Sequence, residues 1–137
     1  MPRILIAYIA TGIAFAMIDS IWLKTMSTRL YQPEIGALLA RDGFRLSPAV
    51  AFYLLYIAGM LYFAVMPALA AEKWQMALLN GAILGFLCYM TYDLTNQATL
   101  KIWSLKVTLA DIAWGTILTG SASLAGYGLT AAITGKS

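Results

Sequence analysis

A chain of 137 residues that is 61% hydrophobic and 11% charged is too apolar for an ordinary soluble domain, in which about a quarter of the residues are charged. Its net charge of +3 favours a role in membrane topology and contact with anionic lipids over nucleic-acid binding. A sequence with no His and one Cys excludes most zinc, haem and iron–sulfur chemistry and any internal disulfide. We expect an all-α integral membrane bundle, one domain of residues 1–137 with four transmembrane helices of about 20 apolar residues each.

The first predicted span covers about residues 4–23. Gly12, Ala16 and Asp19 share one helical face, a strip of small residues that ends in an acid. Small residues let helices approach closely in lipid, so this face should pack inside the bundle. The apolar start resembles a signal peptide, but Asp19 and Trp22 stand where a small-residue cleavage site would lie. A retained first span is therefore predicted.

Residues 24–47 form the one long predicted connection. Pro33 and Glu34 suit the first turn of a helix. The apolar residues that follow share one side of that helix: Ile35, Leu38 and Leu39. The pattern predicts a short interfacial helix, and a basic loop that covers the bundle is the alternative.

The second predicted span covers about residues 48–70, and Ser47 before Pro48 predicts a capped helix start. Pro67 predicts a kink or an early stop near its end. The tyrosines of this span either line a cavity or, as is commoner, pack and anchor at the interface. They are Tyr53, Tyr56 and Tyr62.

The third and fourth predicted spans cover about residues 76–100 and 105–133, after short turns at 71–75 and 101–106. Gly81 and Gly85 form a GxxxG pair, which predicts close helix contact within the bundle or across a dimer. The fourth span has small residues at a spacing of four: Gly115, Thr119 and Ser123.

Acidic residues in three of the predicted spans should meet at one level of the membrane. Asp19 and Asp93 lie near the ends of the first and third spans, and Asp111 lies near the start of the fourth. With four alternating spans all three face the same side, roughly one to two turns inside the helix ends. An ionisable residue inside a membrane usually faces the bundle interior and marks a functional site. These acids are therefore the centre of the predicted site.

Polar and aromatic residues surround this level, because Tyr89, Asp93 and Asn96 share one helical face. The predicted ligand-binding or ion-binding residues are Asp19, Asp93, Asp111, Asn96, Tyr89, Trp22, Trp114 and Thr108. Trp22, Trp114 and Tyr89 are candidate cation–π walls. No resident cofactor is expected, although oxygen ligands of this kind would suit Mg²⁺ or another hard cation.

Three neighbouring carboxylates in a low-dielectric site cannot all stay ionised without compensation. Either one or more holds a proton, or a cation lies among them, or lysines fold back and pair with them. The lysines within reach are Lys24, Lys101 and Lys106. The first two alternatives describe a binding site, whereas the third describes a structural polar cluster.

Two strings carry a family resemblance: residues 92–100 (YDLTNQATL) and residues 103–115 (WSLKVTLADIAWG). Together with Asp19-x-x-Trp22 and Phe52-Tyr53, they resemble the bacterial membrane proteins catalogued as domain of unknown function 2177, DUF2177. The resemblance covers nearly the whole chain. It implies a small multi-span protein of the bacterial inner membrane, and it carries no established activity. Some relatives are encoded beside enzymes that modify membrane fatty acids, which adds weight to lipid-related roles.

Three functions follow from these patterns. The first is binding or transport of a small cation, proton or amphiphile at the acids. The second is a lipid-modifying enzyme linked to fatty-acid modification, although no nucleophile or metal motif stands in the chain. The third is an accessory or assembly subunit. Membrane lipids are the expected partners, together with a second copy of the chain or a partner membrane protein.

The distribution of Lys and Arg predicts the orientation in the membrane. The connections at 24–47 and 101–106 hold six basic residues: Lys24, Arg29, Arg41, Arg45, Lys101 and Lys106. The other side holds three: Arg3, Lys73 and Lys136. Both basic loops are therefore expected in the cytoplasm and both termini outside.

Overall fold

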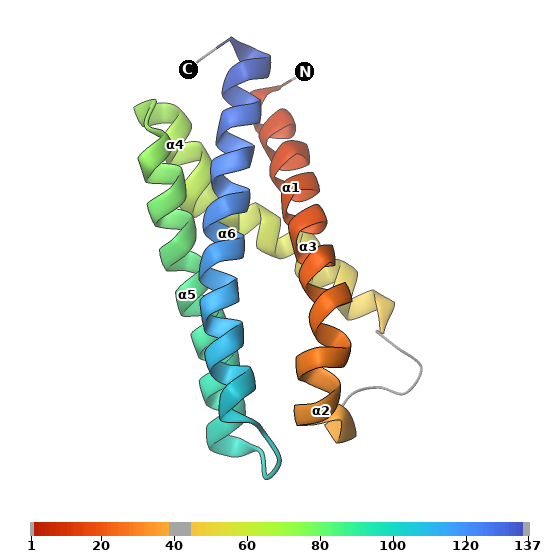
Figure 1. Ribbon diagram of the computed structural model, residues 1–137. Coiled ribbons are helices and arrows are strands. Elements are labelled where there is room, and N and C mark those ends of the chain that lie inside the picture. The colour runs from red at the N-terminus through yellow and green to blue at the C-terminus, as the bar shows by residue number, and fades with distance from the viewer. Residues whose placement is uncertain (1, 39–44, 136–137) are drawn as a thin grey trace.

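The structure, a computed structural model, describes residues 2–38 and 45–135. This part of the chain is helical, without strands. Helix α1 (Arg3–Met26) runs beside α6 (Leu105–Thr134), and α5 (Trp74–Thr99) lies on the other side of α6 (Figure 1). Helix α3 (Leu46–Met60) crosses behind them, and the two termini lie at the same end. The predicted all-α bundle is confirmed.

Three helical segments of the described chain are long and apolar enough to cross a membrane: Arg3–Leu38, Leu46–Ala71 and Trp74–Thr99. Helix α6, expected as the fourth span, is not among them, although its 30 residues extend about 45 Å, which is longer than the bilayer core is thick. It is the central helix of the bundle, between α1 and α5 (Figure 1). Its buried positions include many Gly, Ser and Thr residues that contact neighbouring helices instead of lipid.

The first helix does not end near residue 23 as predicted. It continues through a π-helical turn, η1 (Ser27–Tyr31), into α2 (Gln32–Ile35) and a 3-10 turn, η2 (Gly36–Leu38). The predicted short helix is therefore present as an extension of α1, with Pro33 in its first turn. Leu39, predicted on its apolar side, lies outside the described residues.

Leu30 and Ile35 explain why this extension is stable. Both are buried, and with Val107 of α6 they form a small apolar cluster that is separate from the main core. The extension is held against the first turn of α6 by a hydrogen bond from the Ser104 hydroxyl to the Glu34 carboxylate. The stretch that the sequence presented as a connection therefore covers the acidic end of the bundle.

The second span bends where the proline predicted a bend. Helix α3 continues through a π-helical turn, η3 (Leu61–Val65), into α4 (Met66–Ala71), whose first turn contains Pro67. A π turn changes the hydrogen-bond register by one residue, which accommodates the missing proline N–H. Helix α4 then packs near α5 while α3 leads away from it (Figure 1). The predicted cap at Ser47 is wrong, because α3 begins at Leu46 after an extended Arg45 without a side-chain cap.

Glycines set the distance between α5 and α6. A Cβ on Gly81 would lie 2.6 Å from the Ser123 hydroxyl, and one on Gly85 would lie 2.1 Å from the Gly115 carbonyl oxygen. The GxxxG pair therefore contacts the small-residue face of α6 within one chain. Of the two alternatives for this pair, the structure selects contact within the bundle.

Candidate functional site

Asp19 projects from α1 into the bundle, where 8% of it remains exposed. The Tyr53 hydroxyl of α3 donates a hydrogen bond of 2.6 Å to its Oδ2 atom. The Trp114 indole N–H of α6 donates a longer one, 3.4 Å, to Oδ1. Asp19 thus connects three helices through donors that carry no charge.

Asp111 projects from α6 and is 6% exposed. Its Oδ1 atom accepts a hydrogen bond from the Tyr31 hydroxyl in the extension of α1. The Trp22 indole N–H donates in turn to the Tyr31 oxygen at 2.9 Å. A short chain of donors therefore runs from α1 to the carboxylate of Asp111.

Asp93 of α5 differs from the other two acids. It is fully buried, and no N–H or O–H group of the other described residues donates to its carboxylate oxygens. Its carboxyl lies next to that of Asp111, and Asp19 is close enough to Asp111 for their charges to interact. The three acids therefore do lie close together, as predicted, and among them Asp93 is the one that receives no hydrogen bond from the described residues.

The predicted lysine partners do not account for these contacts. Lys24, Lys101 and Lys106 are exposed, and the donors on Asp19 and Asp111 are tyrosine hydroxyls and a tryptophan N–H. The polar cluster is thus built from neutral aromatic donors.

Trp22 and Trp114, predicted as cation–π walls, stack on each other. Their ring centroids are 4.5 Å apart and their planes differ by 8°. The facing sides of both rings are occupied, so no cation can lie between them. Their role in the structure is to pack α1 against α6 and to donate to Tyr31 and Asp19.

The remaining predicted site residues lie at the edge of this cluster. Thr108 is buried, but its hydroxyl accepts a hydrogen bond of 2.9 Å from the Trp103 indole N–H. Asn96 is half-buried, one turn beyond Asp93. Tyr89 is close enough to Asp19 and Asp111 for electrostatic interaction. A binding role for any of these residues stays a prediction.

Sequence reasoning missed two residues that contact the acids. Tyr31 lies in a stretch that was predicted to be a connection, and nothing in the sequence pairs it with Asp111. The sequence predicts Tyr53 as a cavity, packing or interface residue. The structure shows that its hydroxyl donates a hydrogen bond to Asp19. A tyrosine in an apolar span is a weak signal, since its hydroxyl can reach water or many acceptors.

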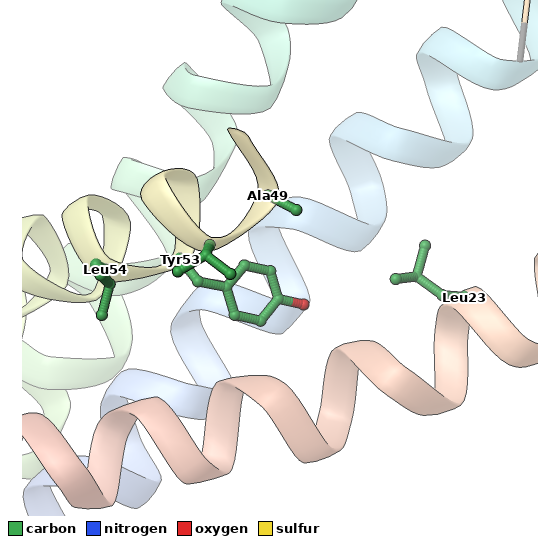
Figure 2. A pocket seen from close by; sticks show the side chains of 5 residues that line it. Leu23, Ala49, Tyr53 and Leu54 are labelled. Carbon is green, nitrogen blue, oxygen red and sulfur yellow. The ribbon is translucent and has the colours of Figure 1, made fainter. Parts of the chain in front are cut away.

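Two grooves open on the two sides of α3. The groove towards α1 has a volume of about 410 Å³ and is lined by Leu23, Ala49, Val50, Tyr53 and Leu54. Figure 2 shows the Tyr53 ring between the two helices, with its hydroxyl on the side of Leu23. The groove towards α5 has a volume of about 290 Å³ and is lined by Phe52, Tyr56, Cys88, Tyr89 and Tyr92.

The acids of the described chain offer few ligands to a metal ion. Within residues 2–38 and 45–135, no three His, Cys, Asp or Glu side chains are placed to hold a metal ion together. In this part of the chain the acids thus offer a hard cation such as Mg²⁺ fewer protein ligands than such ions usually bind.

Comparisons with known proteins agree with the resemblance seen in the sequence. The comparison with curated proteins and the comparison with solved structures each found no match. Residues 4–128 match a family described as predicted membrane protein (DUF2177). Because this match covers most of the chain, the protein belongs to the DUF2177 family of predicted membrane proteins.

Proposed function

We propose that this protein is a bacterial inner-membrane protein whose acid-lined intramembrane site binds and transports a small cation, a proton or a cationic amphiphile. The observation that carries the proposal is Asp93, which is fully buried next to Asp111 and receives no hydrogen bond from the described residues. A buried carboxylate without a partner is costly, so such a group either holds a proton or binds a positive charge. A site that exchanges one for the other would couple cation movement to proton movement.

The neighbouring acids support this role for Asp93. Asp111 lies beside it and Asp19 lies close to Asp111, so each of these acids that is ionised adds negative charge to the site, while its own hydrogen bonds keep it in place. The donors on Asp19 and Asp111 are neutral, so they orient these carboxylates without cancelling their charge. The field that this produces favours a positively charged ligand at Asp93.

The proposed orientation follows the basic residues. Six Lys and Arg residues stand in the connections at 24–47 and 101–106, against three on the other side. The positive-inside rule would then place both connections in the cytoplasm and both termini outside. The site would open nearer to the cytoplasmic leaflet.

One observation favours a second role, as an accessory subunit of a membrane assembly. The donors of Tyr31, Tyr53 and Trp114 join three helices at the acids, as a purely structural cluster would. A partner membrane protein would have to dock on a face other than Gly81 and Gly85, because these glycines already contact α6.

The two roles are separated by flux measurements in liposomes that contain the purified protein and an internal pH-sensitive dye. Na⁺, K⁺, methylammonium and tetraethylammonium would be added one at a time. We expect at least one cation to produce a proton flux that Asp93→Asn abolishes. Glu72→Gln is the matched control, since Glu72 is an exposed acid in the turn after α4. The absence of flux with all four cations, or unchanged flux in Asp93→Asn, would contradict transport and favour the accessory role.

A further inference from the structure

The groove between α3 and α5 has walls that are mainly aromatic. Four of its five lining residues are aromatic, and they lie about two to three helical turns from the near ends of α3 and α5. We propose that this groove binds an organic ammonium ion whose nitrogen carries three or four alkyl groups. The proposal rests on the proposed function, because it names the class of cation that the acidic site receives.

The rings are held in place by their neighbours. Phe52 and Tyr56 of α3 stack with centroids 5.1 Å apart, and the Tyr56 hydroxyl is within 2.8 Å of the Thr119 hydroxyl of α6. Tyr89 of α5 lies against Gly115, where an added Cβ would come within 2.2 Å of the ring. An aromatic wall that is already ordered loses little entropy when a ligand arrives.

The acids close to these aromatic residues favour a cation over a neutral ligand. Tyr92 lies in the electrostatic range of Asp93 and Asp111, and Tyr89 lies in that of Asp19 and Asp111. Aromatic faces attract cations, and quaternary ammonium ions are the ligands that aromatic cages characteristically bind. The fully buried carboxyl of Asp93, which receives no hydrogen bond from the described residues, is an observation independent of the groove, and a nearby positive charge would stabilise its ionised form.

The polarity of the groove selects the kind of cation. Its lining is mostly ring carbon, with phenol hydroxyls and the thiol of Cys88 as the polar groups. A metal ion would lose its hydration without gaining enough oxygen ligands, and a primary ammonium would bring three N–H donors that need acceptors. An alkylated ammonium has few or no donors, and its methyl or ethyl groups pack against rings. The groove therefore favours tertiary and quaternary ammonium ions over primary ones.

Equilibrium dialysis of the purified protein with labelled tetraethylammonium tests the inference, with unlabelled ethylammonium as the competitor. We expect tetraethylammonium to bind, and ethylammonium to compete at least tenfold less well. Tyr92→Leu and Phe52→Leu should each weaken binding by roughly threefold or more, whereas Tyr92→Phe should retain it, since the ring face remains. Both side chains are substantially exposed, at 57% and 44%, so these variants should fold.

Tyr62→Leu is the matched control, because Tyr62 is 75% exposed and does not line this groove. It should bind tetraethylammonium as the unaltered protein does. Equal affinity for the two ions, or full binding by the Leu variants, would overturn the inference and leave the proposed function standing. Tetraethylammonium binding that is indifferent to Asp93→Asn would separate the groove from the acidic site and also overturn the inference, whereas the flux measurements decide the proposed function.

Discussion

Trp22 and Trp114 stack face to face with their ring centroids 4.5 Å apart, and each indole N–H serves a different acid. Trp22 donates to Tyr31, which bonds Asp111, whereas Trp114 donates to Asp19. The stacked pair therefore connects two hydrogen-bonded carboxylates across the α1–α6 interface. Asp93 lies next to Asp111 but receives no hydrogen bond from the described residues, so donors hold two of the three acids and not the third.

The first prediction compares the stability effects of substituting Asp93, which receives no hydrogen bond from the described residues, and Asp19, which accepts two. Asp93→Asn should raise the free energy of unfolding by about 1 kcal/mol, because an amide never carries the charge whose burial, or whose neutralisation by a proton, costs free energy at this site. Asp19→Asn should lower it by about 1–3 kcal/mol, since an amide cannot accept both donors equally well. Unfolding in detergent, followed by tryptophan fluorescence, would measure both.

The two substitutions should change the free energy of unfolding in opposite directions, and this difference separates a functional acid from a structural one. Asp93→Asn should lose cation binding while it gains stability, as is common for groups retained for function. A loss of stability in Asp93→Asn larger than that in Asp19→Asn would show that Asp93 is a structural residue.

The second prediction concerns the close approach of α5 and α6. Gly85→Ala should destabilise the protein by about 1–3 kcal/mol, because the new Cβ would meet a backbone oxygen 2.1 Å away, which cannot rotate aside. Gly59→Ala is the control within α3, where an added Cβ meets nothing within 4 Å. That change should stabilise the helix by about 0.5–1 kcal/mol. Equal effects of the two substitutions on the unfolding midpoint would show that α5 and α6 do not pack as closely as described.

The sequence predicted those features that depend on hydropathy and on the direction of the spans. Long apolar runs predicted the helices, and an even number of spans brought Asp19, Asp93 and Asp111 to one side. The glycine spacing predicted a close helix contact, and the structure identifies the contact as α5 with α6. These inferences succeed because each depends on a local pattern and on a topological rule.

The contacts of the acids could not be predicted, since they depend on side-chain packing between distant segments. Residues 24–31 are polar and basic enough to suggest a loop, yet they stay helical because Leu30 is buried against Val107. That packing, and not local propensity, brings Tyr31 to Asp111. Likewise, two tryptophans on different helices can stack or face a ligand, and only their relative position in space decides which.

The third prediction tests the contact that holds the extension of α1. Ser104 is the N-cap of α6, where its hydroxyl accepts from the Val107 N–H at 3.3 Å and donates to Glu34. Ser104→Ala should cost about 1 kcal/mol or somewhat more, because it removes the cap and a hydrogen bond to a charged group. Ser47→Ala is the control, since Ser47 caps no helix in the structure, and its effect should stay within about 0.5 kcal/mol. A larger loss of stability in Ser47→Ala than in Ser104→Ala would show that Ser47 caps α3, as predicted from the sequence.

The last prediction addresses the hydrogen bond between α3 and α1. Tyr53→Phe removes the donor that lies 2.6 Å from Asp19 and should lower stability by about 1–3 kcal/mol, because a buried acceptor loses its shorter hydrogen bond. Tyr62→Phe is the matched control, since Tyr62 is 75% exposed, and it should change stability by less than about 0.5 kcal/mol. The double variant Tyr53→Phe with Asp19→Asn should lose less than the sum of the two single losses, because both changes disrupt the same bond. Strict additivity of the unfolding free energies would show that Tyr53 and Asp19 do not interact in the membrane protein.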